Sequence, residues 1–238
     1  MKVLKVLLVV FFLFVVSIVL VIGYLGFIPG VSSVMGSDKP RDLGMTYSQE
    51  SYDNALAKAQ TEVKELPANS VASIQYEGSH SVKESFASEE LTAHAYNKTW
   101  VHYPISQVQV RINDDDTCEV SGLIDLTKVD AFLNAFGISQ GDYKKALEKA
   151  NIPMKTLPFY AMGSGTAKDG NLNIDVSKFE IGRFSVPANY IAEYKEEYNS
   201  FGEMVMGKID GFSVNEAYID NGQINFDGTL PDKELTKR

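Results

Sequence analysis

An uninterrupted apolar run sets the first 30 residues apart from the rest of the chain. No charged residue occurs from Val6 to Ile28. At about 1.5 Å per residue, a helix of this length crosses the roughly 30 Å hydrocarbon layer of a bilayer. A secretory signal has a shorter apolar region of about 7–15 residues that ends in small residues. The run therefore predicts an uncleaved transmembrane anchor over residues 1–29, in contact with the lipid bilayer through residues 6–28. A long cleaved signal ending near residues 31–33 is the alternative.

After the anchor, residues 30–45 lack a periodic pattern and predict a juxtamembrane tether. Residues 46–238 predict one extracytoplasmic domain, because no linker, low-complexity run or repeat divides them. Thr46 and Gln49 have the spacing of a capping box, which predicts a helix that begins near Tyr47 and ends before Pro67.

Alternating apolar and polar positions predict four strand pairs in this domain. They span 74–86 with a turn at EGSH, 108–126 with a turn at NDDDT, 159–181 with a turn at KDGN, and 212–226 with a turn at Asn221-Gly222. In the third pair Leu172, Ile174 and Val176 share one face, whereas Phe179 and Ile181 have the opposite parity. This change predicts a β-bulge near Ser177-Lys178, which would bend the sheet.

Helical spacing predicts helices over 88–97, 127–137 and 139–150, and a longer one from Pro187 toward Lys208. The inward stripe expected for the long helix is Ile191, Tyr194, Tyr198, Phe201 and Val205. The order of elements predicts an α+β fold, in which an N-terminal transmembrane helix precedes a curved, mainly antiparallel sheet packed with the long helix and several shorter helices.

The distribution of charged residues predicts the orientation in the membrane and excludes some classes of partner. Lys2 and Lys5 precede the anchor, so the positive-inside rule predicts a single-pass protein of the cell membrane with a cytoplasmic N-terminus and an extracytoplasmic C-terminal domain. The chain has a formal net charge of −9, and the part after the two lysines is more negative still. This balance argues against nucleic acid as a partner and against a basic patch that docks on anionic lipid.

Metal and cofactor motifs are not found in the sequence. His80, His94 and His102 do not form an HExxH motif, and they are interpreted as solvated surface histidines. The cluster NDDD at 113–116 lacks the spaced ligands of a calcium loop and predicts a solvated hairpin tip. The stretch GSGTAKDG at 163–170 lacks GK[ST] and falls inside a strand, so it does not predict a phosphate site. No metal or cofactor is therefore predicted.

Catalytic motifs are also not found. The sequence has no G-x-S-x-G elbow, and its single cysteine, Cys118, lies in a strand pattern typical of a buried thiol. No catalytic residue is predicted, although a hydrolase whose triad is assembled in space remains a third hypothesis.

Four stretches in sequence order resemble the YpmS-like membrane-anchored bacterial proteins. They are FASEELTAHAYNKTW, VQVRINDDDTCEVSGLIDL, PFYAMGSGTAKDGNLNIDVSKFEIGRFSVPANYI and GQINFDGTLP, which lie within residues 84–230. That family has no defined activity, and its design is similar to TULIP-like lipid-binding folds, in which a curved sheet wraps a long helix and lines a channel for acyl chains. The two helices at 127–150 and the segment KPRDLGMTYSQESY depart from the pattern and put the channel in doubt.

These observations predict a non-catalytic extracytoplasmic domain that binds an apolar or lipid-like ligand. The residues expected beside the long helix as a groove are Phe159, Met162, Phe184, Tyr190, Tyr194 and Tyr198, because tyrosine combines an apolar face with a polar tip. The same side chains filling an ordinary core is the competing interpretation. The alternative function is a cell-envelope scaffold that acts through contacts with another envelope protein.

Overall fold

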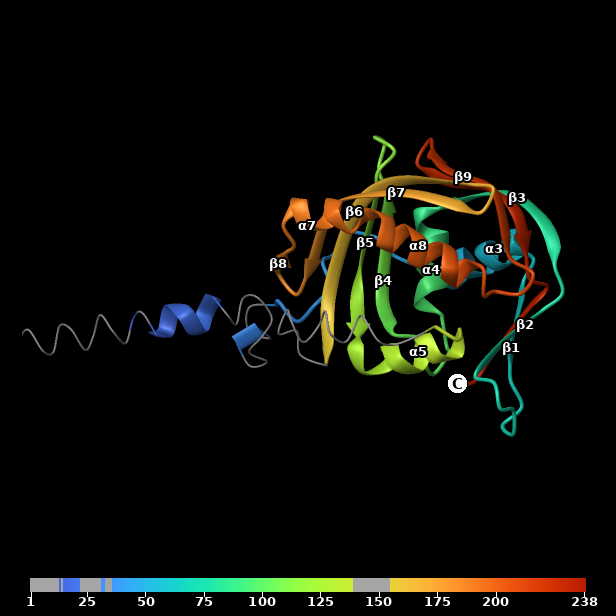
Figure 1. Cartoon of the computed structure of the whole chain (residues 1–238), viewed down its shortest axis with the longest axis horizontal. Helices are drawn as coiled ribbons and strands as arrows, with labels where there is room; N and C mark the ends of the chain where they lie inside the picture. The colour runs from blue at the N-terminus through green and yellow to red at the C-terminus, as the bar shows by residue number, and fades with distance from the viewer. Residues whose placement is uncertain (1–12, 14, 22–30, 33–35, 139–154) are drawn as a thin grey trace, which may run out of the picture.

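The computed structural model describes residues 13, 15–21, 31–32, 36–138 and 155–238 (Figure 1). It confirms an α+β fold with a mainly antiparallel sheet and several helices. Within the described ranges, no helix has both the length and the apolar content needed to cross a bilayer. Most of the predicted anchor and the predicted helix at 139–150 lie outside these ranges.

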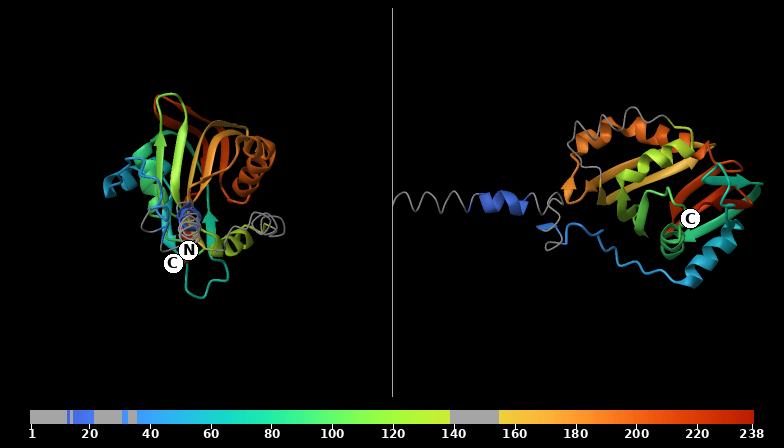
Figure 2. Two further views of the ribbon diagram at one scale, coloured as in Figure 1. Left: turned by 90° about the vertical axis from the view of Figure 1, so that its left-hand side faces the viewer. Right: turned by 90° about the horizontal axis from the view of Figure 1, so that it is seen from below.

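The main sheet contains eight strands. Its path is β3 (His80–Ala87), β10 (Gln223–Leu230), β9 (Ser213–Asp220), β6 (Thr156–Lys168), β5 (Cys118–Asp125) and β4 (Ile105–Ile112). Off this path, β7 (Asn171–Ile181) pairs with β6, and β8 (Phe184–Ser185) pairs with β7. All of these pairs are antiparallel, and the sheet is curved (Figures 1 and 2).

A second, three-stranded sheet was missed by the sequence pattern. Its order is β1 (Glu62–Glu65), β11 (Lys233–Thr236) and β2 (Ile74–Glu77), with β1 parallel to β11. The predicted hairpin over 74–86 is therefore wrong, because β2 pairs with β11 whereas β3 pairs with β10. The chain kinks at Gly78, whose φ of 70° favours glycine, so both halves of the kinked strand stay on the same partner segment.

The helices follow local capping rules with some shifts. Helix α3 (Gln49–Ala59) begins at Ser48, whose side chain accepts a hydrogen bond from the Ser51 amide, and not at the predicted capping box of Thr46. It ends at Gln60, and β1 occupies the rest of the predicted helix. Helix α4 (Ser88–Tyr96), the 3-10 turn η1 (Leu126–Lys128) and α5 (Val129–Ala135) lie where the sequence predicts helices.

The predicted long helix is two helices, α7 (Ala188–Glu193) and α8 (Lys195–Met206), which meet at Tyr194. Its predicted inward stripe is wrong in part, because Tyr194 is 53% exposed and Phe201 is 42% exposed. Asn199 is buried instead. The reason is that α8 lies along the edge of β7, where backbone groups require polar partners.

Two local predictions for the sheet are confirmed. Met162 pairs with Lys178 while Gly163 pairs with Val176, so Ser177 is the extra residue of a bulge. Asn221 and Gly222 have φ of 52° and 71° in the turn between β9 and β10, as a type I′ turn requires.

A compact aromatic core lies at one end of the domain, where α5 meets the three-stranded sheet. The buried residues are Trp100, Leu133, Phe136 and Ile138. The Trp100 and Phe136 rings meet edge to face with 5.8 Å between centroids, a favourable arrangement for aromatic pairs.

Candidate functional site

The main sheet forks at β6. One edge of β6 pairs with β7 from Phe159 to Lys168. The other edge pairs first with β5, over Thr156 to Gly163, and then with β9, over Thr166 to Lys168. The strands β5 and β9 pair with the same edge of β6 and then diverge. Ser164 and Gly165, which lie between the two paired regions, therefore pair with neither strand. An apolar cavity of about 330 Å³ lies at this fork.

Small residues on β6 create the hollow. Ala161, Gly163, Gly165 and Ala167 alternate along the strand and therefore share one face of the sheet. Larger aliphatic residues from neighbouring strands surround them: Val120 on β5, Leu172, Ile174 and Val176 on β7, Ile219 on β9 and Ile224 on β10. Gly163 also permits close packing of the two strands, since a Cβ there would lie 2.4 Å from the carbonyl oxygen of Asp175.

The cavity offers no ionic chemistry. None of the described residues that line it is Asp, Glu, Lys, Arg or His. Cys118 lines it as well, and burial, with a smaller contribution from Glu119, raises the pKa of the thiol to about 11. The thiol is therefore protonated at neutral pH and acts as a small apolar group and not as a nucleophile.

Helix α8 fixes the β7 wall of the cavity through side-chain contacts to the backbone. The Asn199 side chain accepts a hydrogen bond from the Ile174 amide (2.8 Å) and donates one to the Ile174 carbonyl oxygen (3.1 Å). The Glu203 carboxylate accepts from the Leu172 amide (2.8 Å). These bonds satisfy the outer edge of the strand, so Leu172 and Ile174 are held in place while their side chains face the cavity.

Helix α4 covers the opposite edge in the same way. The Thr92 hydroxyl accepts a hydrogen bond from the Val110 amide (2.9 Å) and donates one to the Val110 carbonyl oxygen (3.1 Å). The Ser88 hydroxyl accepts from the Ile112 amide (2.9 Å). Both β7 and β4 are thus paired through helix side chains, which leaves the apolar face between them as the open part of the sheet.

The other face of β5, β6 and β7 is polar and covered by residues 41–45, called the strap below. Arg41 donates two hydrogen bonds to the Glu180 carboxylate, at 2.9 and 2.7 Å, and its guanidinium lies 4.5 Å from the centre of the Tyr160 ring. Gln109 accepts from the Leu43 amide at 2.7 Å. Part of the segment predicted as a tether therefore packs on the sheet.

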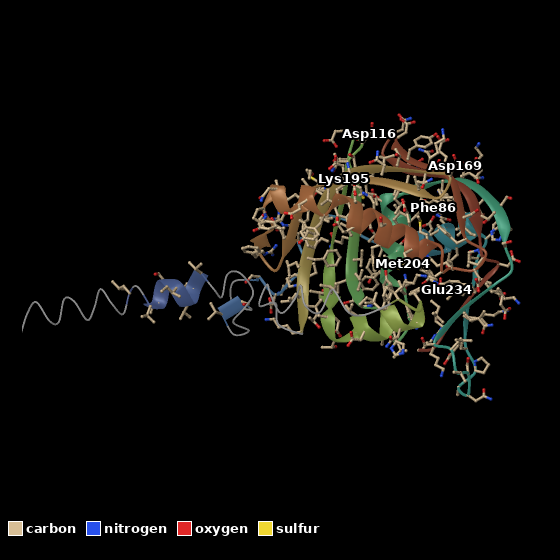
Figure 3. All side chains as sticks on the ribbon, viewed as in Figure 1. Phe86, Asp116, Asp169, Lys195, Met204 and Glu234 are labelled. Atoms are coloured by element: carbon tan, nitrogen blue, oxygen red, sulfur yellow. The ribbon has the colours of Figure 1, made fainter. Side chains whose placement is uncertain are left out.

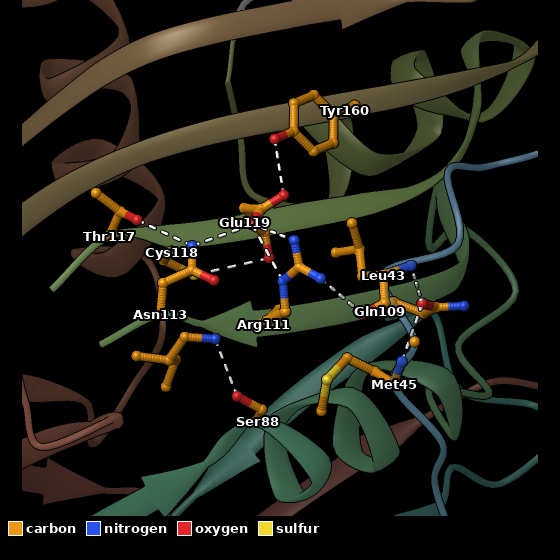
Figure 4. A network of polar contacts seen from close by, with 12 residues as sticks. Leu43, Met45, Ser88, Gln109, Arg111, Asn113, Thr117, Cys118, Glu119 and Tyr160 are labelled. Atoms are coloured by element: carbon orange, nitrogen blue, oxygen red, sulfur yellow. Dashed lines mark hydrogen bonds and ion pairs between the residues drawn. The ribbon is translucent and has the colours of Figure 1, made fainter. Parts of the chain in front are cut away.

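A hydrogen-bonded network continues beneath the strap (Figure 4). The Tyr160 hydroxyl donates to Glu119 (2.8 Å), which also accepts from Arg111 and Asn113. Burial alone would raise the pKa of Glu119, but these donors outweigh it and lower the pKa. Burial and the bond to Glu119 raise the pKa of Tyr160 to about 12. The Glu119 carboxylate and the Tyr160 hydroxyl thus find their hydrogen-bond partners within the protein, which is typical of a structural ion cluster.

A second hollow, of about 360 Å³, lies on the polar face of β3, β9 and β10. Its two lysines are already engaged, Lys83 with Asp227 at 3.0 Å and Lys58 with Glu90 at 2.7 Å. These charges are directed at protein partners and not at the hollow, so the apolar cavity is the stronger candidate for a binding site.

The groove residues predicted from the sequence are dispersed. Met162 lines the cavity. Tyr198 is bonded to the β7 edge, where its hydroxyl accepts from the Val176 amide at 3.3 Å and donates to the Ile174 carbonyl oxygen at 3.4 Å. Phe159 lies on β6, half-buried and two residues before Ala161.

Three further predicted groove residues lie on the surface away from the cavity. Phe184 in β8 is 47% exposed, and Tyr190 within α7 and Tyr194 at its C-cap are each 53% exposed. The structure thus associates Met162 and Tyr198 with the cavity and its wall, and it gathers Phe184, Tyr190 and Tyr194 elsewhere.

Sequence reasoning missed the small residues that make the cavity. The period-two spacing of Ala161, Gly163, Gly165 and Ala167 opposite Leu172, Ile174 and Val176 was the available signal, because it places small side chains against large ones on one face. The prediction that 163–170 lie in a strand and the turn of a hairpin is confirmed, since these residues belong to β6 and its turn to β7.

The histidine interpretation requires one correction. His94 is not a solvated surface residue, because burial, and to a lesser extent the nearby Lys98, lower its pKa to about 4. His80 bonds to Asp232 (2.8 Å) and to the Ala59 carbonyl oxygen (2.9 Å). The described part of the chain holds no cluster of three or more metal-ligating side chains.

Comparisons of this chain with protein-family models, with curated proteins and with solved structures return no match. The resemblance to YpmS-like proteins stays a prediction, and the site is interpreted from its own geometry.

Proposed function

We propose that this protein is anchored in the cell membrane and that its extracytoplasmic domain holds an apolar, lipid-like ligand in the forked cavity without catalysing a reaction on it. The observation that carries the proposal is the apolar cavity of about 330 Å³ at the fork of β6. Pockets for small ligands have volumes of roughly 300–1,000 Å³ and mostly apolar linings, so the cavity fits a small ligand or one chain of a larger one.

The energetics favour an alkyl group over a polar metabolite. Burying one methylene contributes about 0.8 kcal/mol, so eight methylenes contribute about 6 kcal/mol before the cost of association is subtracted. A charged ligand would instead lose its hydration to an apolar lining whose one thiol, Cys118, stays protonated.

The N-terminal sequence supports membrane anchoring. The described residues 15–21 are helical, and Val15, Ile18, Val19, Leu20 and Val21 are between 38% and 58% exposed. Aliphatic side chains that are not covered by the domain are stabilised by insertion in lipid. An anchor would hold the domain beside a source of apolar ligands.

Native mass spectrometry of the detergent-extracted full chain tests the proposal. We expect a co-purified lipid mass on the wild type. Ala217→Leu, which adds bulk to the lining on β9, should reduce lipid occupancy at least about tenfold. Ala188→Leu is the matched control, because Ala188 is exposed at the start of α7. A wild type without bound lipid, or equal occupancy in both variants, would contradict the proposal.

The single cysteine reports the location of the ligand. Cys118 lines the cavity, and at about pH 9–10 a fraction of its thiol is ionised, so a small neutral thiol reagent added at that pH should modify it. Ligand retained in the cavity should slow this reaction at least about fivefold. Delipidated wild type should react at the faster rate. Equal rates with and without lipid would place the bound lipid outside the cavity.

The scaffold hypothesis has its own observation. Phe201 and Met204 are 42% and 43% exposed on α8, where Figure 3 labels Met204. Exposed apolar side chains of this kind are typical of protein contacts. A bound subunit in the same mass spectrum, in place of lipid, would favour this second function.

A further inference from the structure

Three exposed aromatic side chains gather at one corner of the domain. They are Phe184 in β8 and Tyr190 and Tyr194 in α7 and its C-terminal cap, and each is about half exposed. Tyr190 and Tyr194 are four residues apart, so they lie on the same side of the helix. A short turn that includes Pro187 joins β8 to α7, so the elements that carry the three residues lie side by side (Figure 1).

Hydrogen bonds hold this corner against the segment that leads to the predicted anchor. Arg183, next to Phe184, donates to the carbonyl oxygens of Gly36 (3.2 Å) and Lys39 (3.5 Å). Figure 2 shows β8 and α7 at the end of the domain where residues 36–40 begin. The position of Gly36 relative to the membrane therefore also fixes the approximate position of the aromatic corner.

The length of the intervening chain limits how far the corner can be from the membrane. The charge-free run ends at Ile28, about eight residues before Gly36. A fully extended chain spans at most about 3.6 Å per residue, so Gly36 lies within about 29 Å of the end of the run. An anchored chain thus keeps Phe184 within reach of the bilayer surface.

We infer that Phe184, Tyr190 and Tyr194 form a membrane-interface patch that inserts among the headgroups beside the anchor and orients the domain on the bilayer. This inference rests on the anchor of the proposed function. Aromatic rings with polar tips concentrate at the boundary between headgroups and hydrocarbon. The net charge of −9 argues against attraction to anionic lipid, so the occupant is the neutral interface of the bilayer.

Tyr218 provides a matched comparison on the same domain. It is 40% exposed, and it pairs with Thr166, which pairs with Asn173 of β7. About eight residues of β7 separate Asn173 from Ile181, or roughly 26 Å along the strand. A residue with similar exposure therefore lies far from the corner at Phe184.

Quenching by brominated lipid tests the patch in the full chain. Phe184→Trp, Tyr190→Trp and Tyr218→Trp would be reconstituted separately in phosphatidylcholine liposomes with brominated acyl chains. The native Trp100 is 4% exposed and supplies a constant background. We expect the added tryptophan at 184 or 190 to be quenched at least about threefold more than the one at 218. Anionic lipid or added salt should leave the quenching unchanged.

The outcomes separate this inference from the proposed function. Co-flotation of the chain with liposomes, resistant to carbonate, reports the anchor independently of quenching. If the chain floats but the tryptophans at 184 and 190 are quenched no more than the one at 218, the patch is wrong and the anchor stands. If quenching requires anionic lipid and disappears in added salt, the corner binds the membrane by charge attraction, and the proposed aromatic insertion is wrong. A chain that fails to float overturns the anchor and the patch together.

Discussion

The two faces of β5, β6 and β7 differ in chemistry. The outer face is the polar one beneath the strap, and the inner face is the apolar one that lines the cavity. The outer face carries buried charges, and each meets a partner: Glu180 with Arg41, and Glu119 with Arg111 and Tyr160. The inner face carries small and aliphatic side chains around an open cavity. Paired charges therefore hold this region together on the polar face, and the apolar face is the one on which we propose that a ligand binds.

The strap explains why the outer face is closed. Buried carboxylates require donors, and Arg41 of the strap donates to Glu180. The buried Leu43 holds the strap on the same face, because its amide donates to the Gln109 side chain and its carbonyl oxygen accepts from Arg111 at 3.1 Å. The inner face has no such requirement, because apolar side chains can remain half-exposed without an unpaired group. A cavity is thus tolerated on one face only.

Removing the strap cation should have the largest effect. Arg41→Ala leaves the nearly buried Glu180 with Lys178, at 3.3 Å, as its one cation among the described residues, so we expect a loss of about 3 kcal/mol in the free energy of unfolding. Lys83→Ala, which breaks the exposed pair with Asp227, should cost less than about 1 kcal/mol. Denaturant unfolding measures both. Similar losses in the two variants would show that the ion pair of Arg41 stabilises the fold no more than an exposed pair does.

Adding bulk to each face sharpens the comparison. Ser121 is fully buried on the outer side of β5, so Ser121→Leu should overpack it and cost about 2 kcal/mol. Ala217→Leu projects into the cavity and should change stability by less than about 1 kcal/mol. Thermal unfolding of the two variants measures this difference, and a large cost at Ala217 would show that the inner face is a filled core.

Alkaline pH should report on the cavity thiol. The folded pKa of Cys118 is raised from 9.0 to about 11, so the folded chain retains a proton that the unfolded chain releases. Stability from this group is full below pH 9 and is lost as pH rises toward 11, a loss of roughly 2–3 kcal/mol. Cys118→Ala should show a shallower decline over this window. Parallel pH profiles would place the thiol in solvent.

The smallest effect is expected at the cavity wall. Tyr198→Phe removes a hydroxyl whose two bonds to β7 are 3.3 and 3.4 Å long, and it should cost about 0.5–1 kcal/mol. Asn199, with its shorter bonds to Ile174, is the main clamp, so lipid occupancy should be nearly unchanged in Tyr198→Phe. Loss of the ligand with this single hydroxyl would assign Tyr198 a direct role in binding.

Predictions from the sequence succeeded where neighbouring residues decide the structure. The pairs β4–β5, β6–β7 and β9–β10 were predictable because each is a hairpin with local turn chemistry. The bulge at Ser177 was predictable from a change in parity. The break between α7 and α8 at Tyr194 was not predictable, because helical spacing of apolar residues continues through it. The buried side of α8 was not predictable either, because contacts with the edge of β7 select it.

The sequence by itself determined the α+β class, the main hairpins and the charge balance, since periodicity, turn residues and composition act over a few positions. Only the tertiary structure decided the β1–β11–β2 sheet, the strap and the forked cavity. Arg41 and Glu180 are 139 residues apart, and β1 meets β11 near the opposite end of the chain. Such contacts depend on which surfaces remain unpaired after the local elements form, and a linear pattern does not contain that information.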